Sequence, residues 1–217
     1  MESHESRRAS HGAPEDAPDS IRAFFAIEFG MAARRAAERV ARELRARPGG
    51  RTVRWVRAEN YHVTLRFLGQ IARRAVPGLI RHVVGATRRQ APFGLGLGAV
   101  AGLPTVHRPR VVTLDLWPTE PLVDLAGAVE RGVVAAGFPA ESRAFRAHMT
   151  LGRVRRGALS LADAPVPEAS TFEVREVVLL RSRQEAGLGV AYEPLERIAL
   201  GAFDHPANHS VEGRRDG

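Results

Sequence analysis

The sequence predicts an α+β fold built from two lobes. Short alternating stretches that are typical of β-strands are interspersed with amphipathic stretches that are typical of helices. The order strand–helix–strand occurs in both halves of the chain, and each half carries an H-x-T motif late in the segment, at His62 and His148. With 217 residues, 44% of them hydrophobic, the chain can bury a core as one domain or as two closely packed lobes. The pattern therefore suggests an internal duplication.

The first half contains three predicted strands and two predicted helices. The first helix, 31–47, ends at a Pro-Gly-Gly sequence, and both helices carry an apolar stripe at helical spacing. In the first helix this stripe consists of Ala33, Ala36, Ala37, Val40 and Leu44. The strands are expected at 22–28, 53–56 and 61–68, and the second helix at 76–88.

The second half is predicted to repeat this alternation with a single helix. That helix, 121–136, begins with Pro121 and is followed by Gly137, which fits the known asymmetry of helix ends. The strands are expected at 93–97, 110–117, 147–154, 172–182 and 192–200.

The two ends of the chain differ in composition from the rest. Residues 1–20 and 204–217 are polar, so we expect disordered tails around one domain at 21–203. No apolar run approaches the roughly 20 residues that span a bilayer, and the first residues lack the apolar segment of a secretory signal. We therefore expect a cytoplasmic protein with no membrane contact. We also expect it to be a monomer.

The two H-x-T motifs are the main chemical signal. They read HVTL at 62–65 and HMTL at 148–151. Alternation in a strand places the His and the Thr of each motif on one face. Two such strands brought together would offer two proton-transfer groups and two hydroxyl donors, which suits acid–base chemistry on an oxyanion such as a phosphate. The opposite, core-facing side is expected to hold Val63, Leu65, Phe67, Met149 and Leu151.

The composition excludes several kinds of chemistry. The absence of cysteine excludes disulfides, thiolate metal sites and a cysteine nucleophile. All 32 basic residues are arginine, so ligation through a lysine adenylate and a P-loop lysine are both excluded. The net charge of +8 favours a polyanionic partner.

The sequence around both motifs resembles a known family. The segments WVRAENYHVTLRFLG at 55–69 and ESRAFRAHMTLGRV at 141–154 resemble the two signature segments of the 2H phosphoesterases. The resemblance is to their branch of RNA 2′,3′-cyclic phosphodiesterases, historically called 2′–5′ RNA ligases, and extends over about 21–200. The chain departs from the family at Ala147, where proline is frequent, and at 112–114, where tryptophan is frequent.

The resemblance implies two pseudo-symmetric lobes, each an antiparallel sheet backed by helices, with the active site in the cleft between them. It implies hydrolysis of RNA 2′,3′-cyclic phosphate ends to a 2′-phosphomonoester, without a metal or cofactor. In this reading His148 is the proton acceptor that activates water and His62 is the proton donor to the 3′-oxygen, although the near-symmetry of the motifs leaves the opposite assignment open. Thr64 and Thr150 would donate hydrogen bonds to the phosphate.

Two arginines are further candidates for binding the substrate. Arg153 matches the family's basic residue after the second motif, but strict alternation turns it away from His148 unless a twist or bulge follows Gly152. Arg66 has the parity to share the face of His62 and to bind phosphate. A solvated surface charge is the alternative for each.

Three other readings of the sequence remain open. The substrate could be a small cyclic phosphate, such as ADP-ribose 1″,2″-cyclic phosphate or a cyclic nucleotide. A nucleotide-binding module without turnover is disfavoured, because binding alone does not need two proton carriers. The reverse reaction would join RNA ends through a 2′–5′ bond.

Overall fold

The computed structural model describes residues 19–157, 159–168, 171–185 and 189–201. The predicted tails lie outside these ranges, except for Asp19 and Ser20, and Ser20 is the first residue of a strand. The described strands are β1 (Ser20–Glu28), β2 (Val53–Trp55), β3 (His62–Ala72), β4 (Phe93–Leu103), β5 (Val111–Trp117), β6 (His148–Val154), β7 (Thr171–Val174), β8 (Glu176–Glu185) and β9 (Gly189–Ala199). The helices are α1 (Met31–Ala46), α2 (Val76–Thr87) and α3 (Glu120–Ala135), with short 3₁₀ turns η1 (Gly50–Thr52), η2 (Ala58–Asn60) and η3 (Arg73–Ala75).

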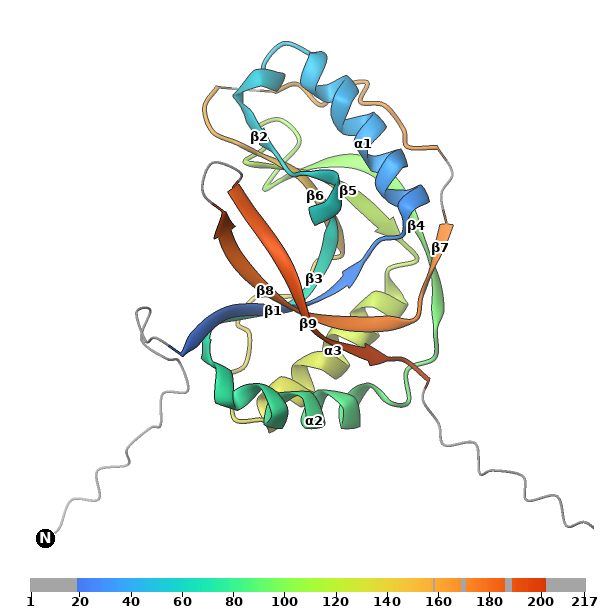
Figure 1. Ribbon diagram of the computed structural model, residues 1–217. Helices are drawn as coiled ribbons and strands as arrows, with labels where there is room; N and C mark the ends of the chain where they lie inside the picture. Colours follow the sequence, from blue (N-terminus) through green and yellow to red (C-terminus); the bar gives the residue numbers. More distant parts are fainter. Residues whose placement is uncertain (1–18, 158, 169–170, 186–188, 202–217) are drawn as a thin grey trace, which may run out of the picture.

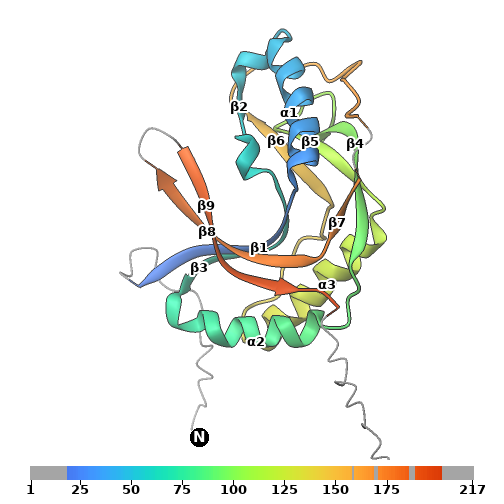
Figure 2. The same cartoon turned by 45° about the vertical axis from the view of Figure 1, so that its right-hand side comes forward.

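The strands form two antiparallel sheets (Figure 1). One sheet has four strands in the order β3-β1-β8-β9, and the other has five in the order β2-β6-β5-β4-β7. Helix α1 lies along the five-stranded sheet, whereas α2 and α3 pack against each other below the four-stranded sheet, as both views show (Figures 1 and 2). The predicted α+β class, with helices backing antiparallel sheets, is therefore confirmed.

The helices follow from the apolar stripes in the sequence. The predicted stripe of α1 is buried, and so is Ala41 beside it. Helix α3 begins one residue before Pro121, and its C-cap is followed by Gly137 at φ +92°, a conformation that costs glycine little. Gly132 lets α3 approach α2 closely, because a Cβ there would lie 2.7 Å from the Cα of Val83.

The two lobes are interleaved along the chain. Strand β2 comes from the first half but joins the second sheet, whereas β8 and β9 come from the second half but join the first sheet. The single strand predicted at 172–182 is two strands, β7 and β8, which belong to different sheets and are separated by Arg175. The lobes are therefore not two consecutive halves of the chain. The sequence did not predict this, because periodicity records which face of a strand is buried but not which strand lies beside it.

The four-stranded sheet is apolar on both faces. One face contributes to the main core, which continues under the five-stranded sheet. The other face carries a small buried cluster with Tyr192 packed on it, consisting of Phe24, Ala26, Val178 and Leu180. No described helix is long and apolar enough to cross a membrane.

Candidate active site

The two motif strands meet although they belong to different sheets. Strand β3 of the four-stranded sheet contacts β6 of the five-stranded sheet (Figure 1). His62 is the first residue of β3, and His148 is the first residue of β6. The charge of His148 acts on the imidazole of His62, so the fold brings the two motif histidines within electrostatic range of each other.

Both histidine rings are held in the same way. Nδ1 of His62 lies 2.7 Å from the carbonyl oxygen of Asn60, and Nδ1 of His148 lies 2.8 Å from that of Arg146, in each case two residues earlier. A carbonyl oxygen can only accept a hydrogen bond, so Nδ1 carries the proton in both rings. In each neutral imidazole this leaves Nε2 as the proton acceptor.

The hydroxyl of the first motif completes this arrangement. Oγ1 of Thr64 lies 3.1 Å from Nε2 of His62 and donates to it when the ring is neutral. Thr64 and Thr150 are both half-buried, and each lies two residues after its histidine on the same face of its strand. In β3 the imidazole of His62 and the hydroxyl of Thr64 are therefore side by side.

Each histidine also has a carboxylate on the neighbouring strand. Glu28 of β1 is the register partner of His62, and Asp115 of β5 is the register partner of His148. Glu28 is held by Arg197, at 2.7 Å. The two lobes thus present the same local pattern around each motif histidine.

His62 lies in an aromatic enclosure. Its ring centroid is 5.0 Å from that of Phe24 and 4.9 Å from that of Tyr192. Burial lowers the pKa of His62 below its usual value, and the positive charges of His148 and Arg153 lower it further. The hydrogen bond to Asn60 and the charge of Glu28 oppose this shift without cancelling it. The low pKa favours the neutral form of His62 in the free protein.

The η2 turn fixes the position of His62 from both sides. On one side the Nδ2 group of Asn60 donates to the carbonyl oxygen of Val190 in β9, at 2.7 Å. On the other side Tyr61 is buried, and its hydroxyl donates to a carboxylate oxygen of Glu38 in α1, at 3.0 Å. Burial raises the pKa of Tyr61, which therefore stays a neutral donor.

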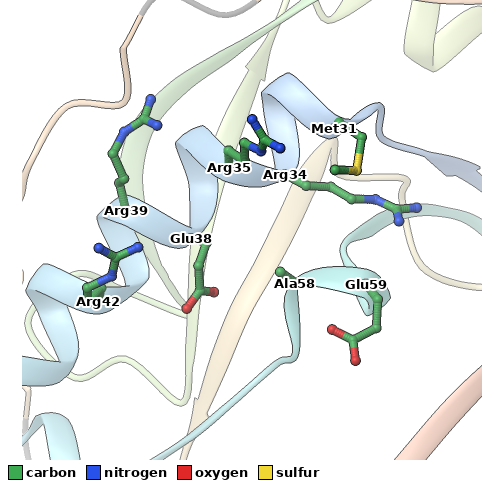
Figure 3. Close-up of a pocket in the computed structure, with 8 residues that line it drawn as sticks. All are labelled: Met31, Arg34, Arg35, Glu38, Arg39, Arg42, Ala58 and Glu59. Carbon is green, nitrogen blue, oxygen red and sulfur yellow. The ribbon is translucent and has the colours of Figure 1, made fainter.

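A groove of about 410 Å³ lies on the opposite side of this turn (Figure 3). It is lined by α1 and η2 and contains none of the motif residues. Of its two carboxylates, Glu38 is bonded to Tyr61, and Glu59 is paired with Arg57. The remaining lining residues are Met31, Arg34, Arg35, Arg39, Arg42 and Ala58.

Comparisons with known proteins identify the family of the chain. Residues 27–113 match the family described as LigT like Phosphoesterase. The RNA 2′,3′-cyclic phosphodiesterase of Aquifex aeolicus is 28% identical, over 83% of this chain and 98% of the relative. The enzyme of that name from Geobacillus stearothermophilus is 30% identical, over 60% of this chain but only 43% of its own length.

Solved structures show the same relationship. A protein of Thermus thermophilus superposes with a TM-score of 0.71 at 26% identity, covering 83% of this chain and 98% of that one. Escherichia coli LigT in complex with 3′-AMP superposes with a TM-score of 0.68 at 30% identity, again covering 83% and 98% of the two chains. The chain belongs to the LigT-like phosphoesterase family, also called the 2H phosphoesterases.

A bulge in each motif strand of this phosphoesterase changes the expected alternation. In β3 the register moves from Thr64 to Arg66 over a single step of β1, so Leu65 is the extra residue. In β6 it moves from Thr150 to Gly152 over a single step of β5, so Leu151 is the extra residue. Each bulge comes three residues after the motif histidine and turns the residues that follow it to the opposite face, and in β3 a second register shift follows between Phe67 and Gly69.

The bulge in β3 makes two sequence-based predictions wrong. Arg66 does not share the face of His62: it is 9% exposed on the core side, where it binds Glu130 and the carbonyl oxygens of Phe67 and Pro139. Phe67 was expected in the core, but it is 54% exposed, and its ring centroid is 5.8 Å from that of Phe24 on the face of His62.

The bulge in β6 has the opposite consequence for Arg153. Arg153 is exposed, and its charge acts on both His62 and Tyr192, so it lies on the side of the motif residues. The sequence allowed this placement only if a twist or bulge followed Gly152. The bulge is present, but it lies at Leu151, just before Gly152. The fifth residue after each histidine, Phe67 or Arg153, thus lies on the face of the motif residues.

Sequence reasoning did not single out several residues of this phosphoesterase site. Phe24 and Tyr192 enclose His62, and the carbonyl oxygens of Asn60 and Arg146 orient the two imidazoles. The only signal available was the position of Asn60 and Arg146, which both come two residues before a motif histidine. Among the described residues, no group of three or more His, Cys, Asp or Glu side chains is placed to hold a metal ion.

Proposed function

We propose that this LigT-like phosphoesterase hydrolyses 2′,3′-cyclic phosphate ends of RNA to 2′-phosphomonoesters. The observation that carries the proposal is the matched pair of histidines, each with Nδ1 bonded to a carbonyl oxygen and Nε2 available for proton transfer. Relatives that share the family carry the name RNA 2′,3′-cyclic phosphodiesterase, among them the Aquifex aeolicus protein, which matches over nearly its whole length.

The proposed reaction needs one base, one acid and donors for the phosphate. His148 takes a proton from water as the water oxygen attacks phosphorus, and His62 gives a proton to the 3′-oxygen as the bond from phosphorus to that oxygen breaks. The products are a 2′-phosphate and a free 3′-hydroxyl. Thr64, Thr150 and Arg153 donate to the non-bridging oxygens, where negative charge increases in the transition state.

The surroundings of the two rings favour this division of roles. His62 is enclosed by two aromatic rings, whereas His148 is the less enclosed of the two and is open to an attacking water. The low pKa of His62 makes its protonated form a strong acid. The negative charge of the bound phosphate supplies the stabilisation that keeps His62 protonated in the complex.

The cleft also has features that suit a nucleotide. Phe67 presents an exposed ring beside Phe24, and aromatic faces of this kind stack on bases without regard to sequence. Arg153 adds a positive charge near His62. A small cyclic phosphate remains the alternative substrate. Joining of RNA ends through a 2′–5′ bond is expected as a side reaction, in which a 5′-hydroxyl replaces water as the nucleophile and the 3′-oxygen leaves phosphorus.

The decisive experiment incubates the protein with a short RNA that ends in a 2′,3′-cyclic phosphate, with and without excess EDTA. We expect a 2′-phosphomonoester at the same rate in both samples, because the proposed acid and base are both histidines. A rate abolished by the chelator and restored by a divalent cation would contradict the two-histidine mechanism. A 3′-phosphate product would show that the other bond to phosphorus breaks.

Parallel assays distinguish the alternatives. A higher kcat/KM for ADP-ribose 1″,2″-cyclic phosphate than for the RNA end would assign the enzyme to the small substrate. Substrate binding without turnover would support a binding module. We retain the monomeric state and the cytoplasm as predictions from the sequence, and light scattering tests the first of them.

A further inference from the structure

Two arginines lie directly opposite each other beside the candidate active site. Arg54 of β2 and Arg153 of β6 are register partners in the antiparallel ladder, and both side chains are exposed. Residues in this relation have Cβ atoms about 5 Å apart, and like charges there destabilise the sheet. Neither guanidinium has a carboxylate partner among the ion pairs of the described residues. An anion bound between them would remove this repulsion.

This pair lies on the side of the motif residues of the phosphoesterase. Burial raises the pKa of Tyr192, and the positive charges of three arginines oppose that rise: Arg153, Arg22 and Arg54. The Tyr192 ring is itself in contact with His62. As the register partner of Arg153 in the antiparallel ladder, Arg54 lies on the same face of the sheet as Arg153.

The position of Arg54 is set by close packing around β2. A Cβ at Gly152 would lie 2.5 Å from Cγ1 of Val53 and 3.1 Å from Cε3 of Trp55, so only glycine lets β2 approach β6 this closely. From there Arg54 reaches the other lobe, because a Cβ on Gly189 of β9 would lie 3.1 Å from its Nη2 atom. The guanidinium of Arg54 therefore lies close to the backbone of β9 in the four-stranded sheet.

We propose that Arg54 forms a second phosphate subsite, which binds the phosphodiester on the 5′ side of the terminal nucleotide of the RNA. The inference rests on the proposed function, since the terminal cyclic phosphate must occupy the site between the histidines. An RNA end has a phosphodiester on the 5′ side of its terminal nucleotide, one nucleotide away from the reacting phosphorus. A cyclic mononucleotide lacks this phosphodiester. A guanidinium binds phosphate oxygens in a two-pronged geometry, and Arg54 offers one directly opposite Arg153 on the same face of the sheet.

The test compares three substrates. They are a nucleoside 2′,3′-cyclic phosphate, a dinucleotide ending in the same cyclic phosphate, and that dinucleotide with an uncharged methylphosphonate linkage. The quantity measured is the ratio of kcat/KM for the dinucleotide to kcat/KM for the mononucleotide. We expect Arg54→Ala to lower this ratio about tenfold, the range for losing one hydrogen-bonded contact to a charged group. In the wild type, replacing the linkage by a methylphosphonate should lower the ratio by a similar factor. In Arg54→Ala the same replacement should cause no further loss.

A matched control removes the same charge elsewhere. Arg35 is an exposed arginine of α1 in the groove on the far side of η2 (Figure 3), and Arg35→Ala should leave the ratio unchanged. The salt dependence gives a second readout, because each phosphate contact to a single strand contributes about 0.7 to the log–log slope of affinity on salt concentration. For the dinucleotide, Arg54→Ala should therefore reduce the magnitude of this slope by about 0.7.

The outcomes separate this inference from the proposed function. An unchanged ratio in Arg54→Ala, or an equal loss in Arg35→Ala, would overturn the subsite and assign the effect to overall charge. If the wild type hydrolyses neither charged substrate, the proposed function fails instead. Circular dichroism and melting of both variants establish that the ratio is measured on folded protein.

Discussion

Arg66 provides the sharpest test of the fold, because sequence and structure assign it different roles. We consider Arg66→Met, which keeps the length of the side chain but removes the guanidinium. Arg66 is 9% exposed and is held by Glu130, by Glu141 at 3.7 Å and by two backbone carbonyl oxygens. The substitution leaves these acceptors without their donor in a partly buried position.

The size of the effect follows from the exposure of the partners. Removing one member of a fully buried ion pair costs about 3–5 kcal/mol. Glu130 is 28% exposed and Glu141 is 34% exposed, so water can partly replace the lost donor. We therefore expect Arg66→Met to lower the free energy of unfolding by about 2–3 kcal/mol, below the fully buried range.

Urea unfolding measures this change through the transition midpoint at constant slope. The control is Arg73→Met, because Arg73 is 52% exposed and lies 3.7 Å from Asp19, which is also exposed. It should change stability by less than about 0.5 kcal/mol. If Arg66→Met keeps wild-type stability while KM for a cyclic phosphate rises, Arg66 is a substrate ligand and the structural assignment is wrong.

Four further predictions concern the site. His62→Ala and His148→Ala should each lower kcat by at least about 10²-fold, and the double variant should lose far less than the product, because both act in one step. Thr64→Ala and Thr150→Ala should each cost about 2–4 kcal/mol of transition-state stabilisation in kcat/KM if the hydroxyls donate to phosphate. NMR titration should place the pKa of His62 below the usual value for histidine, and His148→Gln should raise it by removing a positive neighbour; an unchanged pKa would show that the rings do not interact. Phe67→Ala should raise KM for cyclic nucleotides with little change in melting temperature, since the ring is 54% exposed, and a large loss of stability would instead make Phe67 a packing residue.

The sequence predicted the elements well where periodicity was long. The helix expected at 31–47 is α1 at Met31–Ala46, and the helix expected at 121–136 is α3 at Glu120–Ala135. Stripes of apolar residues identify such helices because the buried face follows directly from 3.6-residue spacing. The strands were found from their period of two, but the strand expected at 93–97 extends as β4 to Leu103, and the strand expected at 172–182 is divided at Arg175 into β7 and β8.

The bulges are the main feature that alternation could not give. A bulge adds one residue to one strand only, so it depends on the partner strand and not on the bulged sequence. The segment after Thr64 reads Leu-Arg-Phe-Leu, which fits a regular strand as well as a bulged one. This is why Arg66 and Phe67 were assigned to the wrong faces, while Arg153 could be placed only conditionally.

The sequence by itself determined the fold class, the family resemblance and the two H-x-T motifs, because these depend on residue type and local spacing. Only the tertiary structure decided which strands are neighbours, and thereby that β2, β8 and β9 cross to the other lobe. It also decided that Tyr192 encloses His62 and that Arg54 faces Arg153. Each of these contacts joins segments distant in the chain, and their partners are selected by the packing of two complete sheets.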